Sequence, residues 1–100
     1  MSPEEFNSIR ESSRYLLVDF YADWCEPCKM LDEILVEVSS SLKEHIKIIK
    51  VDIDASEEIR HEFVIQSIPT LIFFKDGILL WRMPGFMMAP ELVKKIKEYI

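Results

Sequence analysis

The feature that most constrains the fold is a short apolar run at 15–22 (YLLVDFYA), in which Asp19 is the single charged residue. The run is too short for a helix, and its apolar residues do not alternate with polar ones as in a strand with one solvated face. Such runs are typical of strands that helices cover on both faces. The chain is therefore predicted to be an α/β protein, and Asp19 is predicted to be buried.

Other local patterns place the remaining elements around this strand. Ser2 followed by Pro3 and Glu5 is typical of a helix start, and Asp76-Gly77 between two apolar runs indicates a hairpin. Apolar residues at helical spacing mark the other helices. The predicted order is a helix over 2–13, a strand over 15–22, a helix from 25 to 42, a strand over 46–53, a helix from 56, strands over 70–74 and 78–83, and a helix from 90.

This order predicts a mixed sheet. The first two strands are joined by a helix and should run parallel, whereas the last two form a hairpin and should run antiparallel. Helices are then expected on both faces of the sheet. No linker rich in Gly, Ser or Pro and no repeat divides the sequence, so residues 1–100 are expected to form a single domain.

Composition excludes several classes of function. With 18 acidic and 12 basic residues and a net charge of −6, the chain has no basic patch for nucleic acid. Its apolar runs are far shorter than the ~18 residues of a membrane span. The acidic start also lacks the features of a signal peptide, so a soluble protein in a reducing cytoplasm is the expectation.

Two cysteines, Cys25 and Cys28, stand where the buried strand gives way to a helix. Residues three apart in a first helical turn are close enough to form a disulfide with little backbone movement. Cys25 faces the unpaired N–H groups and the positive end of the helix dipole, which favour its thiolate and make it the predicted nucleophile. Cys28 lies one turn further in and is predicted to be more buried, as suits a resolving thiol.

Two other interpretations of this pair remain open at this point. The cysteines could be two small buried hydrophobes, or they could be half of a metal site. A zinc site is the weaker interpretation, because the sequence has no second cysteine pair and His45 and His61 are not at finger spacing. Each histidine is expected at the surface, and redox chemistry is favoured over metal binding.

Three segments together resemble the thioredoxin family. Residues 18–30 (VDFYADWCEPCKM) are similar to its active-site segment, Ser67-Ile68-Pro69-Thr70 to its cis-proline loop, and Lys75-Asp76-Gly77 to its hairpin. The resemblance runs from about 15 to 100, and three motifs in order are more specific than a lone C-x-x-C. It implies a thioredoxin fold. The stretch before Asp19 is short, so four strands are expected, without the N-terminal strand of common thioredoxins.

The resemblance also implies the activity and its partners. It indicates a protein-disulfide reductase that uses Cys25 and Cys28, needs no metal or organic cofactor, and is recharged by an upstream disulfide reductase such as a thioredoxin reductase. Disulfide-containing proteins are the expected clients, and the protein is expected to be a monomer. Two alternatives are a thiol oxidase or disulfide isomerase of the same fold, and a binding module with incidental redox activity.

Further residues gain a role through the resemblance. Asp19 is implied as the carboxylate that the Cys28 thiol reaches through water, and burial should raise the pKa of Asp19 toward neutrality. Lys50 resembles the family's lysine near that carboxylate, although a lysine in a strand can simply face solvent. The Ile68–Pro69 bond is expected to be cis. The substrate-binding rim around Cys25 is expected to comprise Trp24, Ile53, Ile68, Pro69, Gly85 and Phe86.

Some of these roles compete with plainer ones, and the sequence departs from the family in places. Ile53 and Ile68 could be core residues, and the bulky segment Phe86-Met87-Met88 could either adapt to varied partners or only cover the last helix. Glu26 stands where the family usually has Gly, and its charge should slightly disfavour the Cys25 thiolate. The direction of the redox reaction therefore depends on a potential that the sequence does not give.

Overall fold

In the computed structural model, which describes residues 1–100, the elements follow the predicted order. The helices are α1 (Pro3–Ser12), α2 (Glu26–Leu42), α3 (Glu57–Glu62) and α4 (Ala89–Lys97), with a short 3-10 turn, η1 (Lys43–His45), after α2. The strands are β1 (Tyr15–Tyr21), β2 (Lys47–Asp52), β3 (Thr70–Lys75) and β4 (Ile78–Pro84). The turn η1 was not predicted. Its Lys43 has a φ of 47°, a value that usually requires glycine, and the sequence has no glycine there to indicate the turn.

The strands form a mixed sheet, as predicted. Its order is β2-β1-β3-β4 in a four-stranded sheet, with β1 parallel to β2 and antiparallel to β3. The hairpin strands β3 and β4 are antiparallel, with an irregularity between Phe73 and Phe74. The central strands β1 and β3 are buried along almost their whole length, which explains their continuous apolar sequence.

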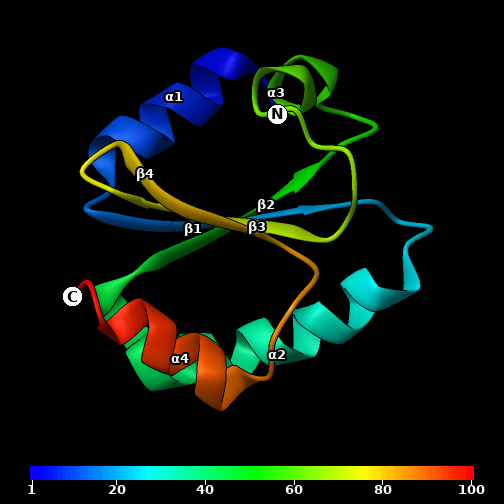
Figure 1. The fold of residues 1–100 in the computed structure, drawn as a ribbon. Coiled ribbons are helices and arrows are strands. Elements are labelled where there is room, and N and C mark those ends of the chain that lie inside the picture. Colours follow the sequence, from blue (N-terminus) through cyan, green and yellow to red (C-terminus); the bar gives the residue numbers. More distant parts are fainter.

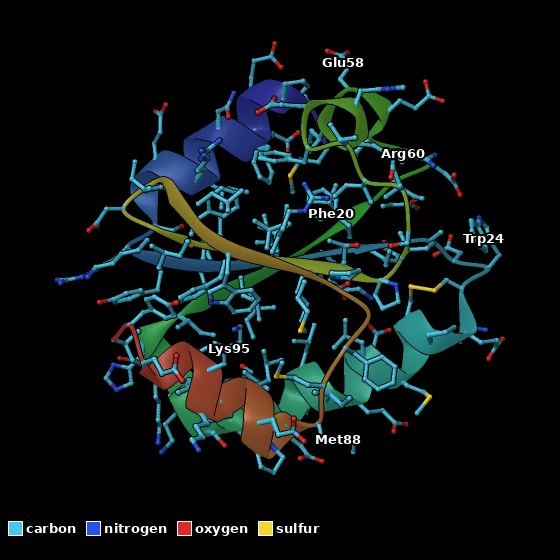
Figure 2. The ribbon with its side chains drawn as sticks, viewed as in Figure 1. Phe20, Trp24, Glu58, Arg60, Met88 and Lys95 are labelled. Atoms are coloured by element: carbon cyan, nitrogen blue, oxygen red, sulfur yellow. A yellow bond between two sulfur atoms is a disulfide. The ribbon has the colours of Figure 1, made fainter.

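Helices cover both faces of the sheet, so the molecule has two core layers. Figure 1 shows α1 and α3 on one face and α2 and α4 on the other. Alternate residues of β1 enter the two layers: Val18 and Phe20 pack beneath α1 and α3, and Leu17 packs against α2 and α4. Phe20 points toward α1 and α3 in Figure 2. By the same alternation Asp19 belongs to the α2 side.

Local sequence signals account for the helix starts near the site. Ser2 caps α1 by accepting a hydrogen bond from the Glu5 backbone N–H at 3.1 Å, and Pro3 follows at the first helical position. Cys25 is the N-cap of α2, again with a proline in the first turn. None of the helices combines the length and the apolar character that crossing a membrane requires.

Candidate active site

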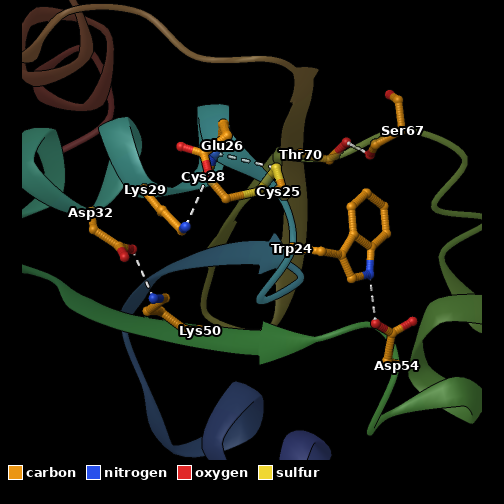
Figure 3. Close-up of a disulfide and its surroundings, with 10 residues drawn as sticks. All are labelled: Trp24, Cys25, Glu26, Cys28, Lys29, Asp32, Lys50, Asp54, Ser67 and Thr70. Carbon is orange, nitrogen blue, oxygen red and sulfur yellow. Dashed lines mark hydrogen bonds and ion pairs between the residues drawn. A yellow bond between two sulfur atoms is a disulfide. The ribbon is translucent and has the colours of Figure 1, made fainter.

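A disulfide joins Cys25 and Cys28 at the junction of β1 and α2. The two Cα atoms are 5.3 Å apart, within the range that a disulfide requires. The Cys25 sulfur also accepts a hydrogen bond from the Cys28 backbone N–H at 3.2 Å, and Figure 3 shows this contact at the start of the helix. The first sulfur therefore satisfies one of the unpaired N–H groups of α2, as expected for a nucleophile held at a helix N-terminus.

The two cysteines are almost equally buried. Cys25 is 4% exposed and Cys28 is 3% exposed, so the predicted difference in burial between them is nearly absent. The reason is that both side chains pack into the core layer beneath α1 and α3. What distinguishes them is position on the helix: Cys25 is the cap that accepts the N–H bond, and Cys28 is the residue that donates it.

Asp19 is fully buried, as predicted. Neither of its carboxylate oxygens has a hydrogen-bond partner in the protein. Desolvation by burial raises the pKa of Asp19 to about 7, opposed by the positive charge of Lys50 and assisted by the negative charge of Asp32. An acid with a pKa near neutrality can both accept and release a proton at physiological pH, which is the property expected of this residue.

Lys50 lies beside Asp19 on the neighbouring strand, in register with it. Its ammonium group, however, binds Asp32 of α2, with Nζ and Oδ1 2.7 Å apart (Figure 3). Burial lowers the pKa of Lys50, but the hydrogen bond to Asp32 and the charges of Asp32, Asp19 and Tyr21 together outweigh this effect and raise it. Lys50 is therefore near Asp19, as predicted, while its direct partner is a different carboxylate.

Asp32 was not among the residues predicted from the sequence. Its spacing offered a signal, since a residue four positions after Cys28 lies on the same face of a helix. Many exposed helical carboxylates share that spacing, so it did not mark Asp32 as functional. Only the fold brings Lys50 of β2 to this face of α2 and shows the pair.

The loop before β3 contains the predicted cis peptide bond between Ile68 and Pro69. Two hydrogen bonds fix the loop at its end: the Thr70 hydroxyl donates to the Ser67 carbonyl at 2.7 Å, and the Gly85 backbone N–H donates to the Pro69 carbonyl at 2.7 Å. Gly85 has a φ of +80°, a conformation that glycine adopts without strain. Gly85 thus lies directly against the proline loop.

Trp24 is the exposed aromatic residue predicted beside the cysteines. Its side chain is 68% exposed, and its indole N–H donates to Asp54 Oδ2 at 2.9 Å (Figure 3). Asp54 in turn donates its backbone N–H to Asp52 Oδ1 at 2.9 Å. Asp54 was not predicted from the sequence, because it is 30 positions from Trp24 and no local pattern connects them.

A small cleft opens beside Trp24, with a volume of about 200 Å³. It is lined by Trp24, Ile53, Arg60 and residues 65–68. Ile53 is only 3% exposed and belongs to the core, so it forms the base of this cleft. Ile68 is half-buried at its edge.

Phe86 follows Gly85, the residue whose backbone N–H donates to the Pro69 carbonyl. It is half-buried and packs against the core layer formed with α2 and α4, which is the covering role that the sequence left open. Met87 packs against the same layer, whereas Met88 is 57% exposed and points outward at the start of α4 (Figure 2). A direct role for Phe86 at the rim stays a prediction.

Glu26 forms an exposed ion pair with Lys29, with Oε1 and Nζ 3.0 Å apart (Figure 3). The Glu26 side chain is 82% exposed, so solvent screens its charge. The positive charge of the Lys29 ammonium further offsets the negative charge of Glu26 near Cys25. The protein contains no group of three or more His, Cys, Asp and Glu side chains arranged to hold a metal ion.

These features define a class: an α/β protein of the thioredoxin fold with a disulfide-forming cysteine pair at the N-terminus of a helix. The chain belongs to the thioredoxin family, because the family model described as Thioredoxin matches residues 1–98. Membership and the cysteine pair together support thiol–disulfide oxidoreductase activity. The predicted fold, including the sheet of four strands, is confirmed.

Known proteins similar to this chain span nearly all of it. A thioredoxin-like protein of Synechocystis sp. is 40% identical over 89% of this chain and 85% of its own length. A thioredoxin of Mycoplasmoides gallisepticum is 41% identical over 93% of this chain and 92% of its own length. The oxidized form of mitochondrial thioredoxin 3 from Saccharomyces cerevisiae superposes with a TM-score of 0.88 at 32% identity, over 97% of this chain and 90% of that chain.

Proposed function

We propose that the protein reduces disulfides in client proteins through the Cys25–Cys28 pair. The observation that carries the proposal is the position of the pair, with Cys25 as the N-cap of α2 and its sulfur bound to a backbone N–H. A sulfur held in this way is stabilised as a thiolate when the disulfide is reduced. The buried carboxyl of Asp19 supplies a group of suitable pKa for the proton transfer that follows.

In the first step the reduced protein attacks a client disulfide. The Cys25 thiolate forms a bond to one client sulfur, the client S–S bond breaks, and the other client sulfur leaves as a thiolate. The product is a mixed disulfide between Cys25 and the client. Trp24 and the backbone beside Ile68 would hold the client segment during this step, since both border one cleft and Trp24 directly precedes Cys25 in the sequence.

In the second step Cys28 resolves the mixed disulfide. Its thiol gives up a proton through water to ionised Asp19, and the resulting thiolate attacks the Cys25 sulfur. The Cys25–Cys28 disulfide forms while the second client sulfur leaves as a thiolate. Two electrons have then passed from the protein to the client. An upstream disulfide reductase must return them, and a reducing compartment favours this direction.

Cysteine variants test the proposal directly. In insulin reduction with dithiothreitol, the native protein should accelerate precipitation of the insulin B chain, and Cys25→Ser should remove all of that acceleration. Cys28→Ser should instead accumulate a mixed disulfide through Cys25, seen as a covalent adduct by mass spectrometry. Equal rates for the native protein and Cys25→Ser would contradict the reductase function.

Glu26 supports one competing function, because a charge between the cysteines can change the potential that sets the direction of exchange. A titration in glutathione buffers measures the reduction potential of the cysteine pair. A reductase is expected below about −200 mV, and an oxidase or isomerase above it.

The binding module is tested by removing both cysteines. A Cys25→Ser/Cys28→Ser variant that kept all cellular function would favour the binding module. Gel filtration tests the expectation of a monomer.

A further inference from the structure

The turn after α3 contains a residue in an unfavourable backbone conformation. Val64 has a φ of 50°, a left-handed value that is rare for β-branched residues because the Cβ atom crowds the backbone. Its side chain is 61% exposed, so burial of the valine does not hold it there. Something else must maintain this conformation.

Backbone hydrogen bonds close one side of the turn. The Val64 N–H donates to the His61 carbonyl at 3.2 Å. The Ile65 N–H donates to the Arg60 carbonyl at 3.1 Å. These bonds satisfy carbonyls of α3, but they leave the carbonyls of the turn itself without backbone partners.

Arg82 of β4 binds those carbonyls. Its Nη1 donates to the Phe63 carbonyl at 2.6 Å, and its Nη2 donates to the Val64 carbonyl at 3.3 Å. Arg82 is in register with Ile72 of β3, and Ile72 belongs to the core layer beneath α1 and α3, so both side chains point to the α3 side of the sheet. The planar guanidinium can bind two successive carbonyls, which a lysine ammonium does less well.

The turn at Val64 leads directly into the proline loop, residues 65–69, which is proposed to bind the client segment. The next residues, 65–68, line the cleft beside Trp24 and end at the cis Pro69. The far end of the loop is fixed by the bonds of Thr70 and Gly85 described above. At the other end of the loop, the Arg60 Nε donates to the Ile65 carbonyl at 3.3 Å, and Arg82 binds the two carbonyls just before it.

We propose that Arg82 is a positioning residue for client binding, which holds the left-handed turn at Val64 so that residues 65–68 border the cleft beside Trp24. This inference rests on the proposed reductase function for its effect on clients. Arg82 itself contacts neither the cysteines nor Asp19 in the hydrogen bonds of the structure. Its loss should therefore weaken client binding without changing the reactivity of the cysteines.

Amide hydrogen exchange followed by NMR tests the turn without any client. Arg82→Ala should accelerate exchange of the Val64 and Ile65 amides about tenfold, the effect of losing one charge-assisted hydrogen bond, while amides of β1 stay unchanged. Arg82→Lys should give an intermediate rate, and it keeps the test available if Arg82→Ala fails to fold. Unchanged exchange at both amides in the variant that folds would overturn the proposal.

A second substitution at Val64 supplies the matched control. In the Arg82→Ala background, Val64→Gly should restore slow exchange, since glycine adopts a positive φ without strain. Val64→Thr keeps the branched Cβ and should restore nothing. Both changes are at an exposed side chain, so core packing stays the same. Equal recovery with Thr and Gly, or recovery with neither, would contradict a role in holding this turn.

Client kinetics then test the consequence. Arg82→Ala should raise KM for insulin about tenfold, the same loss expressed as binding, with kcat little changed. Reaction of the reduced protein with the small disulfide 5,5′-dithiobis(2-nitrobenzoate), which needs no loop contact, should keep its native rate. A fall in kcat, or an equal slowing with the small disulfide, would overturn the proposal. If the native protein does not reduce insulin, the reductase function fails, and amide exchange alone decides the role of Arg82.

Discussion

At the scale of single residues, Asp19 links the stability of the protein to pH. The folded protein holds its carboxyl proton more tightly than the unfolded chain does, because burial raises the pKa from 3.8 to about 7. Below both values Asp19 is protonated in both states and has no effect on stability. As pH rises from 3.8 to about 7, the folded protein loses stability, because a buried carboxyl is costly to ionise. Above about 7 this loss is complete.

Asp19→Asn tests this effect in the oxidised protein. The difference between the two pKa values converts to an upper limit of about 4 kcal/mol. At pH 8 the variant should therefore be more stable than the native protein by a substantial part of that amount, and near pH 4 the two should be almost equal. Urea unfolding at both pH values measures the difference. If Asp19→Asn were instead less stable than the native protein at pH 8, the expected cost of ionising buried Asp19 would be contradicted.

Asp19 also shows how far the sequence reaches at this scale. Its burial was predictable, because its apolar neighbours leave a strand residue no exposed face. Lys50 near Asp19 was expected only from the family resemblance, and Asp32, which binds Lys50 from another element, was not predicted. The loss of water around Asp19 is a local consequence of the strand, whereas the charges around it depend on how the elements are assembled.

At the scale of elements, the ion pair between Asp32 and Lys50 joins α2 to the edge strand β2. This pair fixes the position of the Lys50 ammonium, whose positive charge lowers the pKa of Asp19. While Lys50 is bound to Asp32, its ammonium is drawn toward α2, and the Asp32 carboxylate adds its own repulsion on the ionised form of Asp19. The position of one helix relative to one strand thus contributes to the pKa of a third residue.

Asp32→Asn should lower the pKa of Asp19 below about 7, since one negative charge is removed and Lys50 is released to interact with Asp19. Carbonyl-carbon NMR of Asp19 over a pH series measures this. Glu33→Gln is the matched control, because it removes the same charge one position along α2 at an exposed residue and should leave the titration nearly unchanged. An equal shift in both variants would mean that Asp32 acts only through the net charge of the helix.

The ends of the elements show what local patterns miss. The strands over 15–22 and 46–53 were predicted slightly longer than β1 and β2, and α4 begins at Ala89, one residue before the predicted Pro90. Residues such as Ala22 and Ile53 are buried as strand residues are but make no ladder pairs. Apolar patterns report burial, and burial continues past the last paired residue of a strand.

At the scale of the whole molecule, α1 is fastened to the sheet through one aromatic cluster. Phe6 is 1% exposed and contacts the rings of Phe63 and Phe74, with centroids 5.4 Å and 6.1 Å away. Arg10 of the same helix donates to the Gly77 carbonyl at 2.8 Å. The first helix therefore connects the end of α3 with the β3–β4 hairpin, and it completes the core layer that also contains both cysteines.

Phe6→Ala should lower the free energy of unfolding by about 3–5 kcal/mol, the usual cost of removing a buried aromatic ring. Thermal and urea unfolding measure the change. Val36→Ala is the control, since Val36 is 68% exposed on α2, and it should change stability by no more than about 0.5 kcal/mol. A small effect of Phe6→Ala would mean that α1 contributes little to the layer that supports the cysteines.

The sequence by itself determined the order of the α-helices and strands, the mixed sheet, the cysteine pair at a helix start and the buried Asp19. Each follows from apolar spacing, capping residues or turn residues within a few positions of one another. The partner of Lys50, the bond between Trp24 and Asp54, and the hold of Arg82 on Val64 were decided only by the tertiary structure. These contacts join residues 18 or more positions apart, so they depend on how twist and packing direct the chain in space, which no local pattern encodes.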